Sequence, residues 1–167
     1  QDFDNLKFDK SAIDDEWKDW KKKYSISALS PVSGGGSAQA EFEILCGVKS
    51  NLEYGTEFNR LGTKPIPCLP NYLKNFGYLS FASQPLYGSF FNNKKAYESF
   101  GFDEIWLQEN FDMSKKNNGW LSDESFFNQH LKLIEPYLKK DQPILNYLFA
   151  VGCHTQVLFK DHSPKVS

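Results

Sequence analysis

Ser37 is the side chain best suited to chemistry in this sequence, because a run of glycines precedes it and a helical pattern follows it. Residues 34–36 are glycines, and apolar Phe42 and Leu45 follow Ala38 at four and seven residues. This spacing predicts an amphipathic helix with Ser37 at or near its N-terminus. The free N–H groups and the helix dipole at such an end favour an anion such as phosphate, and glycines let the backbone approach it closely. Ser37 is therefore a candidate nucleophile; the alternative is that it only caps the helix.

Three further polar residues follow apolar stretches near the end of the chain. Asp161 and His162 come after apolar residues 157–159, and His154 comes after the apolar run 144–151. Both places are expected strand ends. An oxygen and an imidazole at adjacent positions suit zinc or manganese. The alternatives are that Asp161 and His162 form a surface turn and that His154 is satisfied in a loop.

Five segments, in order, resemble the phosphoglycerol transferase and lipoteichoic acid synthase group of the alkaline phosphatase and sulfatase superfamily. They are GGGSA with EFEILCG (34–47), CLPNYLKNFGY (68–78), FFNN with Tyr97 and FGFD (90–103), LSDE (121–124) and DHSP (161–164). The resemblance implies that Ser37 attacks phosphorus and also binds a metal ion. It further implies that Asp161 and His162 are metal ligands and that His154 contacts the phosphate.

The implied chemistry needs a metal, because an alcohol is a weak nucleophile near neutral pH. A divalent cation can lower the pKa of the hydroxyl and neutralise charge on the phosphoryl oxygens. The resemblance thus implies one zinc or manganese ion and a phosphotransferase with a covalent intermediate on Ser37. A phosphoglycerol or phosphoethanolamine-type group would pass from a phospholipid-like donor to a glycan or lipid of the cell envelope. Formylglycine sulfatases carry Cys/Ser-x-Pro-x-Arg, and neither the Pro nor the Arg follows Ser37.

The expected substrate segment departs from the family pattern at one position. The resemblance matches residues 91–93 to a Phe/Trp-Asn-Arg segment that helps lipoteichoic acid synthases hold glycerol phosphate, so Phe91 and Asn93 are substrate-binding candidates. Asn93 lacks the planar, always charged guanidinium that grips a phosphate with two hydrogen bonds. Lys94 or Lys95 could replace that group as a point charge, which leaves the head group open.

Other departures concern the completeness of the site. Family members carry a first metal-binding carboxylate, usually Glu, at the end of a strand before the nucleophile, and no such strand is visible here. Six residues separate His154 from Asp161, where the family has some tens. We expect one sulfatase-like catalytic domain over residues 1–167 that lacks the first metal-ligand strand and a C-terminal portion. The alternatives are a non-catalytic relative that binds glycans or a membrane partner, and a hydrolase of the phosphodiesterase or sulfatase type.

The composition is that of an ordinary folded domain. The 167 residues are 40% hydrophobic and 16% aromatic, enough for one buried core. A net charge of −2 with scattered Lys and Arg gives no basic stripe, so no nucleic acid partner is expected. The sequence holds no run of about twenty apolar residues and no signal-peptide pattern. The resemblance nevertheless implies a periplasmic or extracytoplasmic domain whose membrane anchor lies outside this chain.

The cysteines bear on the same question of compartment. Cys46 and Cys68 flank 21 residues rich in Gly, Pro and polar types, a loop that a disulfide could close. The resemblance to extracytoplasmic proteins favours this disulfide, which would steady the helix that begins near Ser37. Cys153 would then be a free thiol. The alternative is that all three cysteines are reduced and buried.

Helical and strand patterns alternate along the chain. Helices are predicted over residues 13–24, 38–47, 69–76 and 92–100, with a further helix after the cap residue Ser122. Strands are predicted near residues 78–82, 104–107, 145–151 and 157–159. The strand at 145–151 is expected to be buried and central in the sheet. The last helix is expected to bury Phe126, Phe127, Ile134 and Tyr137 and to carry His130 on its surface.

This alternation predicts an α/β fold with a mostly parallel sheet flanked by helices, as in alkaline phosphatase and sulfatase-like proteins. Sites in such sheets lie at the carboxyl ends of the strands. Ser37, His154 and the Asp161–His162 pair are all expected there.

Overall fold

The computed structural model of the chain describes residues 15–26, 36–50, 58, 65–117 and 119–151. The chain divides into two compact units, Gln1–Pro31 and Val32–Ser167. The described helix of the first unit is α1 (Asp15–Tyr24), which lies within the predicted helix. Its Trp17 and Trp20 rings stack with their centroids 5.3 Å apart, as expected for aromatic residues one turn apart on a helix.

The second unit alternates helices and strands. The α-helices among its described residues are α2 (Ser37–Cys46), α4 (Leu69–Lys74), α5 (Asn93–Phe100) and α6 (Asp123–Leu138). Its strands are β1 (Leu79–Ser83), β2 (Glu104–Trp106), β3 (Lys116–Asn117), β4 (Trp120–Leu121) and β5 (Ile144–Leu148). The described residues also form the short 3-10 helices η3 (Phe90–Asn92), η4 (Gln108–Asn110) and η5 (Met113–Lys115).

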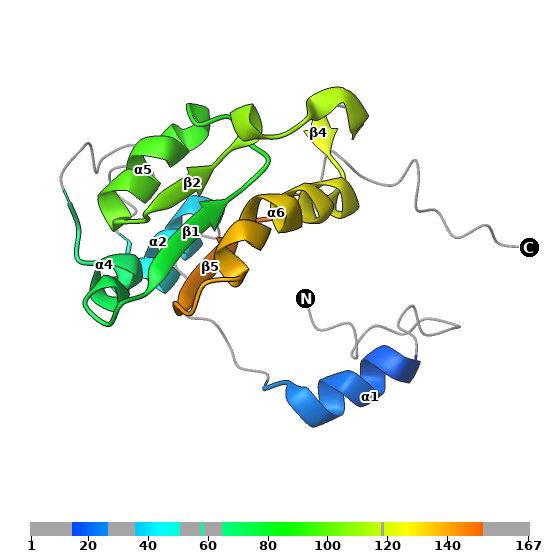
Figure 1. Cartoon of the computed structure of the whole chain (residues 1–167), viewed down its shortest axis with the longest axis horizontal. Coiled ribbons are helices and arrows are strands. Elements are labelled where there is room, and N and C mark those ends of the chain that lie inside the picture. The colour runs from blue at the N-terminus through cyan, green and yellow to red at the C-terminus, as the bar shows by residue number, and fades with distance from the viewer. Residues whose placement is uncertain (1–14, 27–35, 51–57, 59–64, 118, 152–167) are drawn as a thin grey trace, which may run out of the picture. The chain divides into compact units, whose positions relative to one another are not determined.

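A parallel sheet with the strand order β2-β1-β5 organises this unit (Figure 1). Phe81 of β1 pairs with Glu104 of β2 and with Asn146 of β5, and both pairings are parallel. Helix α5 connects β1 to β2, while α6 lies between β2 and β5 in the chain. The predicted α/β fold with a parallel sheet and flanking helices is therefore confirmed.

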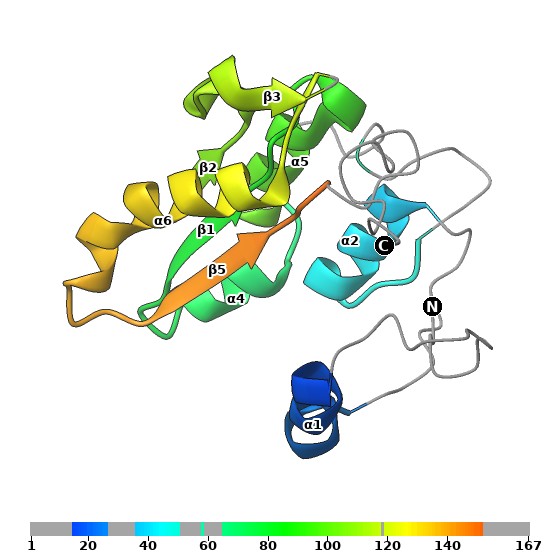
Figure 2. The same ribbon diagram turned by 90° about the vertical axis from the view of Figure 1, so that its right-hand side faces the viewer.

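Helices α2 and α5 cover one face of the sheet and α6 covers the other (Figure 2). Alternate side chains of the strands enter two cores, one on each face. On one face, Ala82 of β1 packs with buried residues of α2 and α5, including Phe42 and Phe100. On the other face, Phe81 of β1 packs with Trp106 and with buried residues of α6. Helix α2 is thus covered by the sheet on one side, which places its N-terminus beside the sheet.

Helix α6 corrects part of the predicted burial pattern. Phe126 and Ile134 are buried as predicted, but Phe127 is 41% exposed and Tyr137 is only partly buried. His130 is 1% exposed, so the prediction of a surface histidine is wrong. The reason is geometric: residues 126, 130 and 134 repeat every four positions and form the stripe that faces the sheet, whereas Phe127 is rotated away from it.

His130 is held in this core as a neutral ring. Its Nε2 lies 3.0 Å from Nδ2 of Asn146 on β5, and its ring centroid lies 5.4 Å from that of Trp106. Burial lowers the pKa of His130, an effect that the hydrogen bond to Asn146 only partly offsets. The residue therefore packs as a core side chain at neutral pH.

Strand β5 and the expected polar loop differ from their predictions. Strand β5 spans Ile144–Leu148 and not 145–151, and within the described part of the sheet it is half-buried with β1 as its neighbour. The expected strand at 157–159 lies outside the described residues. An antiparallel β3–β4 pair occupies the expected polar loop, where Gly119 takes a φ of +90° that favours glycine.

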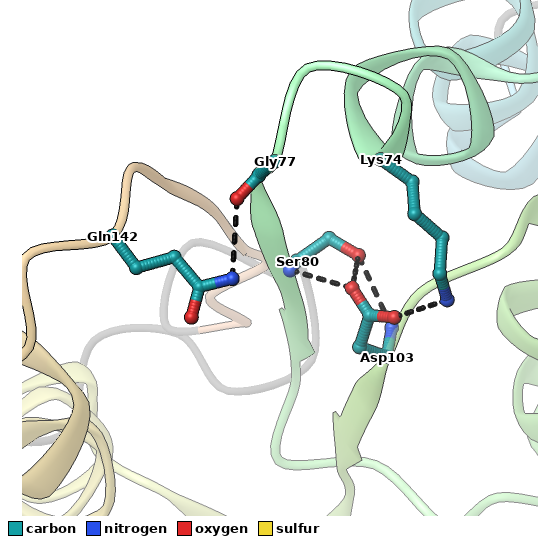
Figure 3. Close-up of polar contacts among 5 residues, drawn as sticks. All are labelled: Lys74, Gly77, Ser80, Asp103 and Gln142. Carbon is teal, nitrogen blue, oxygen red and sulfur yellow. Dashed lines mark hydrogen bonds and ion pairs between the residues drawn. The ribbon is translucent and has the colours of Figure 1, made fainter.

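A closed polar network joins β1 and β2 at their amino ends (Figure 3). Asp103 accepts hydrogen bonds from the backbone N–H of Ser80 at 2.9 Å and from its Oγ at 2.8 Å. Lys74 of α4 lies 2.6 Å from the other oxygen of this carboxylate. Burial alone would raise the pKa of Asp103, but the bonds from Lys74 and Ser80 hold it below its usual value. Nearby, Gln142 donates a hydrogen bond to the carbonyl of Gly77 at 3.1 Å.

Candidate active site

Ser37 is the first residue of α2, and Gly36 occupies the N-cap position with extended backbone angles and no side-chain cap bond. The cap is therefore a glycine, and the interpretation that Ser37 serves only as the N-cap does not match the structure. The exposed hydroxyl of Ser37 lies where free N–H groups and the helix dipole favour an anion. The other end of α2 is joined by the Cys46–Cys68 disulfide to the residue before α4.

Ser37, Phe91 and Asn93 line one cavity of about 390 Å³. Sequence reasoning placed these three residues in one site, and the structure brings them together. The cavity also opens onto Gln84, just after β1, and Phe149, just after β5. It therefore lies at the carboxyl ends of the parallel strands, the usual place for a ligand in an open α/β sheet.

The backbone beside the cavity is strained in the segment that carries the substrate candidates. Phe91 has φ +47° and Asn92 has φ +61°, angles that L-residues other than Asn and Asp rarely adopt. Asn92 donates a hydrogen bond from Nδ2 to the carbonyl of Phe58 at 2.8 Å, which holds this turn in place. Strain of this kind costs about 1–3 kcal/mol per residue and is concentrated at functional sites.

Glu41 is a buried carboxyl in the wall of the same cavity, and its role was missed at the sequence level. It is 5% exposed and lies one helical turn after Ser37. The hydroxyl of Tyr97 donates a hydrogen bond to Glu41 Oε2 at 2.5 Å, and Tyr147 supplies a second hydroxyl contact. Burial raises the pKa of Glu41 to about 7, although the two tyrosines act in the opposite direction. The only hint in the sequence is the i, i+4 spacing from Ser37.

Gln84 is a second residue that sequence reasoning missed. It lines the cavity at 1% exposure, and its Nε2 has no hydrogen-bond partner among the described residues. A buried amide donor of this kind is costly unless a ligand or water satisfies it. Phe90 and Trp120 form an aromatic wall beside it, with their rings edge-on at 6.4 Å. The β3–β4 pair that presents Trp120 had no signal in the sequence beyond a polar loop.

The predicted metal ligands Asp161 and His162, and the phosphate contact His154, lie outside the described residues. Within the ranges that the structure describes, no group of three or more His, Cys, Asp or Glu side chains is arranged to hold a metal. Lys94 and Lys95 are exposed, and no Lys or Arg is found among the described residues that line the cavity. None of the described helices is both long and apolar enough to cross a bilayer.

The chain is similar to a protein family over nearly its whole length and to individual proteins over parts of it. The family model described as Sulfatase matches residues 16–167. The lipoteichoic acid synthase LtaP from Listeria monocytogenes has a similar fold, with a TM-score of 0.72 and 24% identity over 78% of this chain and 32% of that protein. A protein in the alkaline phosphatase superfamily from Vibrio parahaemolyticus gives a TM-score of 0.58 and 20% identity over 74% of this chain and 30% of its own.

A sequence relative comes from Rhizobium meliloti (strain 1021), where it carries the name cyclic beta-1,2-glucan modification protein. It is 37% identical over 101 residues, which are 59% of this chain and 16% of that protein. The chain thus spans about a sixth of this relative and about a third of the two solved structures.

Proposed function

The chain belongs to the sulfatase family, within the alkaline phosphatase and sulfatase superfamily, and we propose that the cavity at Ser37 is the reaction site of a phosphotransferase. The group transferred is of the phosphoglycerol or phosphoethanolamine type. The donor is a phospholipid-like phosphodiester, and the acceptor is a glycan or lipid of the cell envelope. The reaction takes place on the extracytoplasmic face of the membrane.

The position of Ser37 is the single observation that supports this proposal most. Its hydroxyl lies at the first residue of α2 and lines a cavity that also contains Phe91 and the buried Asn93. The N–H groups of the first turn can bind phosphoryl oxygens, while Asn93 and the unpaired amide of Gln84 can donate hydrogen bonds to the same group. A nucleophile and hydrogen-bond donors for a phosphoryl group therefore surround the same cavity.

In the first step, Ser37 Oγ forms a bond to phosphorus as the bond from phosphorus to the lipid alcohol breaks. The hydroxyl proton leaves Ser37, and the departing lipid oxygen takes up a proton. Ser37, Asp161 and His162 offer two oxygens and an imidazole, a donor set that fits zinc or manganese. Such a cation, when bound, would lower the pKa of the hydroxyl and neutralise phosphoryl charge.

In the second step, an acceptor hydroxyl forms a bond to phosphorus, loses its proton and releases Ser37, which regains a proton. Water in place of the acceptor would make the same site a phosphodiesterase. His154 would assist at the phosphate. The name of the Rhizobium relative, a glucan modification protein, makes an envelope glycan a reasonable acceptor. The absence of Pro and Arg after Ser37 argues against the formylglycine chemistry of sulfate-ester hydrolysis.

A comparison of two model substrates tests this proposal. The intact protein, supplied with zinc or manganese, is assayed on bis-p-nitrophenyl phosphate and on p-nitrophenyl sulfate, with Ser37→Ala beside it. We expect turnover of the phosphodiester alone and its loss in the variant. Turnover that survives Ser37→Ala, or a preference for the sulfate ester, would contradict the proposal.

A further inference from the structure

Glu41 connects α2 to the rest of the fold in the half of the helix that begins at Ser37. Its side chain lies one turn after Ser37 on α2, on the same side of the helix, and both residues line the cavity. The carboxyl is buried, so its oxygens need partners inside the protein.

Those partners come from two different elements. Tyr97, fully buried on α5, donates its hydroxyl hydrogen to Glu41 Oε2, and Tyr147 on β5 makes the second hydroxyl contact. The rings of Tyr97 and Tyr147 themselves lie edge-on with centroids 6.3 Å apart. One carboxyl thus joins α2 to α5 and to β5, whose Tyr147 side chain packs in the core that α2 and α5 form on one face of the sheet.

Helix α2 is held differently at its other end. There the Cys46–Cys68 disulfide holds the helix. In addition, Glu43 Oε1 accepts hydrogen bonds from the backbone N–H of Ser50 at 3.1 Å and from its Oγ at 2.8 Å. The Gly36 cap adds no side-chain bond. The two halves of α2 therefore have separate attachments: Glu41 in the half that begins at Ser37, and Glu43 with the disulfide in the half that ends at Cys46.

We propose that Glu41 is a positioning residue, whose hydrogen bonds with Tyr97 and Tyr147 fix the first turn of α2 and hence the direction of Ser37 Oγ. This inference rests on the proposed role of Ser37 as nucleophile. A displacement of about 1 Å at a reacting atom can lower the rate about 100-fold. Losing the hydrogen bonds of Glu41 should therefore lower kcat and leave substrate binding largely intact.

The variants Glu41→Gln and Tyr97→Phe test the proposal, and Glu43→Gln is the matched control. Glu43→Gln changes the same helix and the same residue type but at the attachment to Ser50. We expect Glu41→Gln and Tyr97→Phe to lower kcat for the phosphodiester about 10- to 100-fold with KM changed less than about threefold. Glu43→Gln should keep kcat within about twofold.

Hydrogen exchange of the backbone amides in the first turns of α2 gives a readout independent of turnover. We expect faster exchange near Ser37 in Glu41→Gln and Tyr97→Phe, with no such change in Glu43→Gln. Folded variants that keep both kcat and amide protection would overturn the inference. If Ser37→Ala retains full turnover, the proposed function fails, while the exchange data still decide whether Glu41 tethers the helix.

Discussion

The two ends of the parallel sheet differ in how their buried polar groups are satisfied. At the amino end, Ser80 of β1 exchanges hydrogen bonds with Asp103, which also pairs with Lys74 (Figure 3). At the carboxyl end of the same strand, Ser83 Oγ and Gln84 Nε2 are buried without a partner among the described residues. The polar groups at the amino end form a closed network, whereas at the carboxyl end Gln84, which carries an unpaired Nε2, lines the cavity.

This difference indicates which end is built for stability and which for a ligand. A satisfied buried network stabilises the fold, whereas an unpaired buried donor costs about 1–3 kcal/mol and is retained where a ligand uses it. The positive φ of Phe91 adds strain at the carboxyl end. Substitutions at the amino end should therefore change stability, and those at the carboxyl end should change activity.

The largest effect is expected for Ser37→Ala at the carboxyl end. Removing the hydroxyl should lower phosphodiester turnover by about 10³-fold or more, because no other described residue that lines the cavity carries a hydroxyl or thiol. The melting temperature should stay nearly constant, since Ser37 is exposed and does not cap α2. Ser114→Ala, which removes another exposed hydroxyl, is the control and should leave the turnover rate as it is. Equal activity of the two variants would remove the assignment of function to this end of the sheet.

The next effect is a pH dependence of stability caused by Glu41. Its pKa is raised from 4.5 to about 7 in the folded protein, so the folded state keeps a proton that the unfolded state has lost between these pH values. The contribution of Glu41 to the free energy of unfolding is then fully present below about pH 4.5. It falls by about 3 kcal/mol as the pH rises to about 7.

Urea unfolding of the wild type and of Glu41→Gln from pH 4 to 8 measures this effect. Glu41→Gln should lack the Glu41 part of the pH dependence, because an amide does not titrate. Identical slopes in the two proteins would show that Glu41 is not the group responsible.

Two serines on one strand give a smaller but sharper contrast. Ser80→Ala removes a hydroxyl that bonds Asp103 and should lower the free energy of unfolding by about 1–2 kcal/mol with activity unchanged. Ser83→Ala removes a buried hydroxyl without a described partner and should leave stability unchanged or slightly higher. Chemical denaturation of both variants measures the difference, and equal losses would mean that the two ends are alike.

The smallest effect compares one substitution at the two ends. Gln84→Met replaces the unpaired amide with an apolar side chain and should raise stability by up to about 1 kcal/mol while lowering turnover. Gln142→Met at the amino end removes the bond to the Gly77 carbonyl and should lower stability slightly with turnover unchanged. Thermal unfolding and phosphodiester turnover check both variants. The same sign of stability change at both sites would contradict the comparison.

The elements of the second unit could largely be predicted because their signals are local. Apolar spacing, Gly47 after the first helix of this unit and the Ser122 cap all act within a few residues. The same local reasoning placed Ser37 at a helix start, and the resemblance grouped it with Phe91 and Asn93.

Other features depend on contacts far apart in the chain, which periodicity does not reveal. Glu41 is 56 residues from Tyr97, and their bond exists only because α2 and α5 pack on one face of the sheet. His130 was misjudged because its burial is set by which stripe of α6 meets the sheet, and its partner Asn146 comes from β5. The burial of Gln84 likewise follows from the turn after β1 and has no signature in the residue type.

The most direct measurement is the intact mass of the protein after brief incubation with a phosphodiester donor, followed by peptide mapping. If Ser37 is the nucleophile, we expect a phosphoryl-containing adduct on Ser37 that is absent from Ser37→Ala and is cleared when an acceptor alcohol is added. Turnover without an adduct on Ser37, or an adduct on another residue, would contradict the assignment of Ser37 as nucleophile.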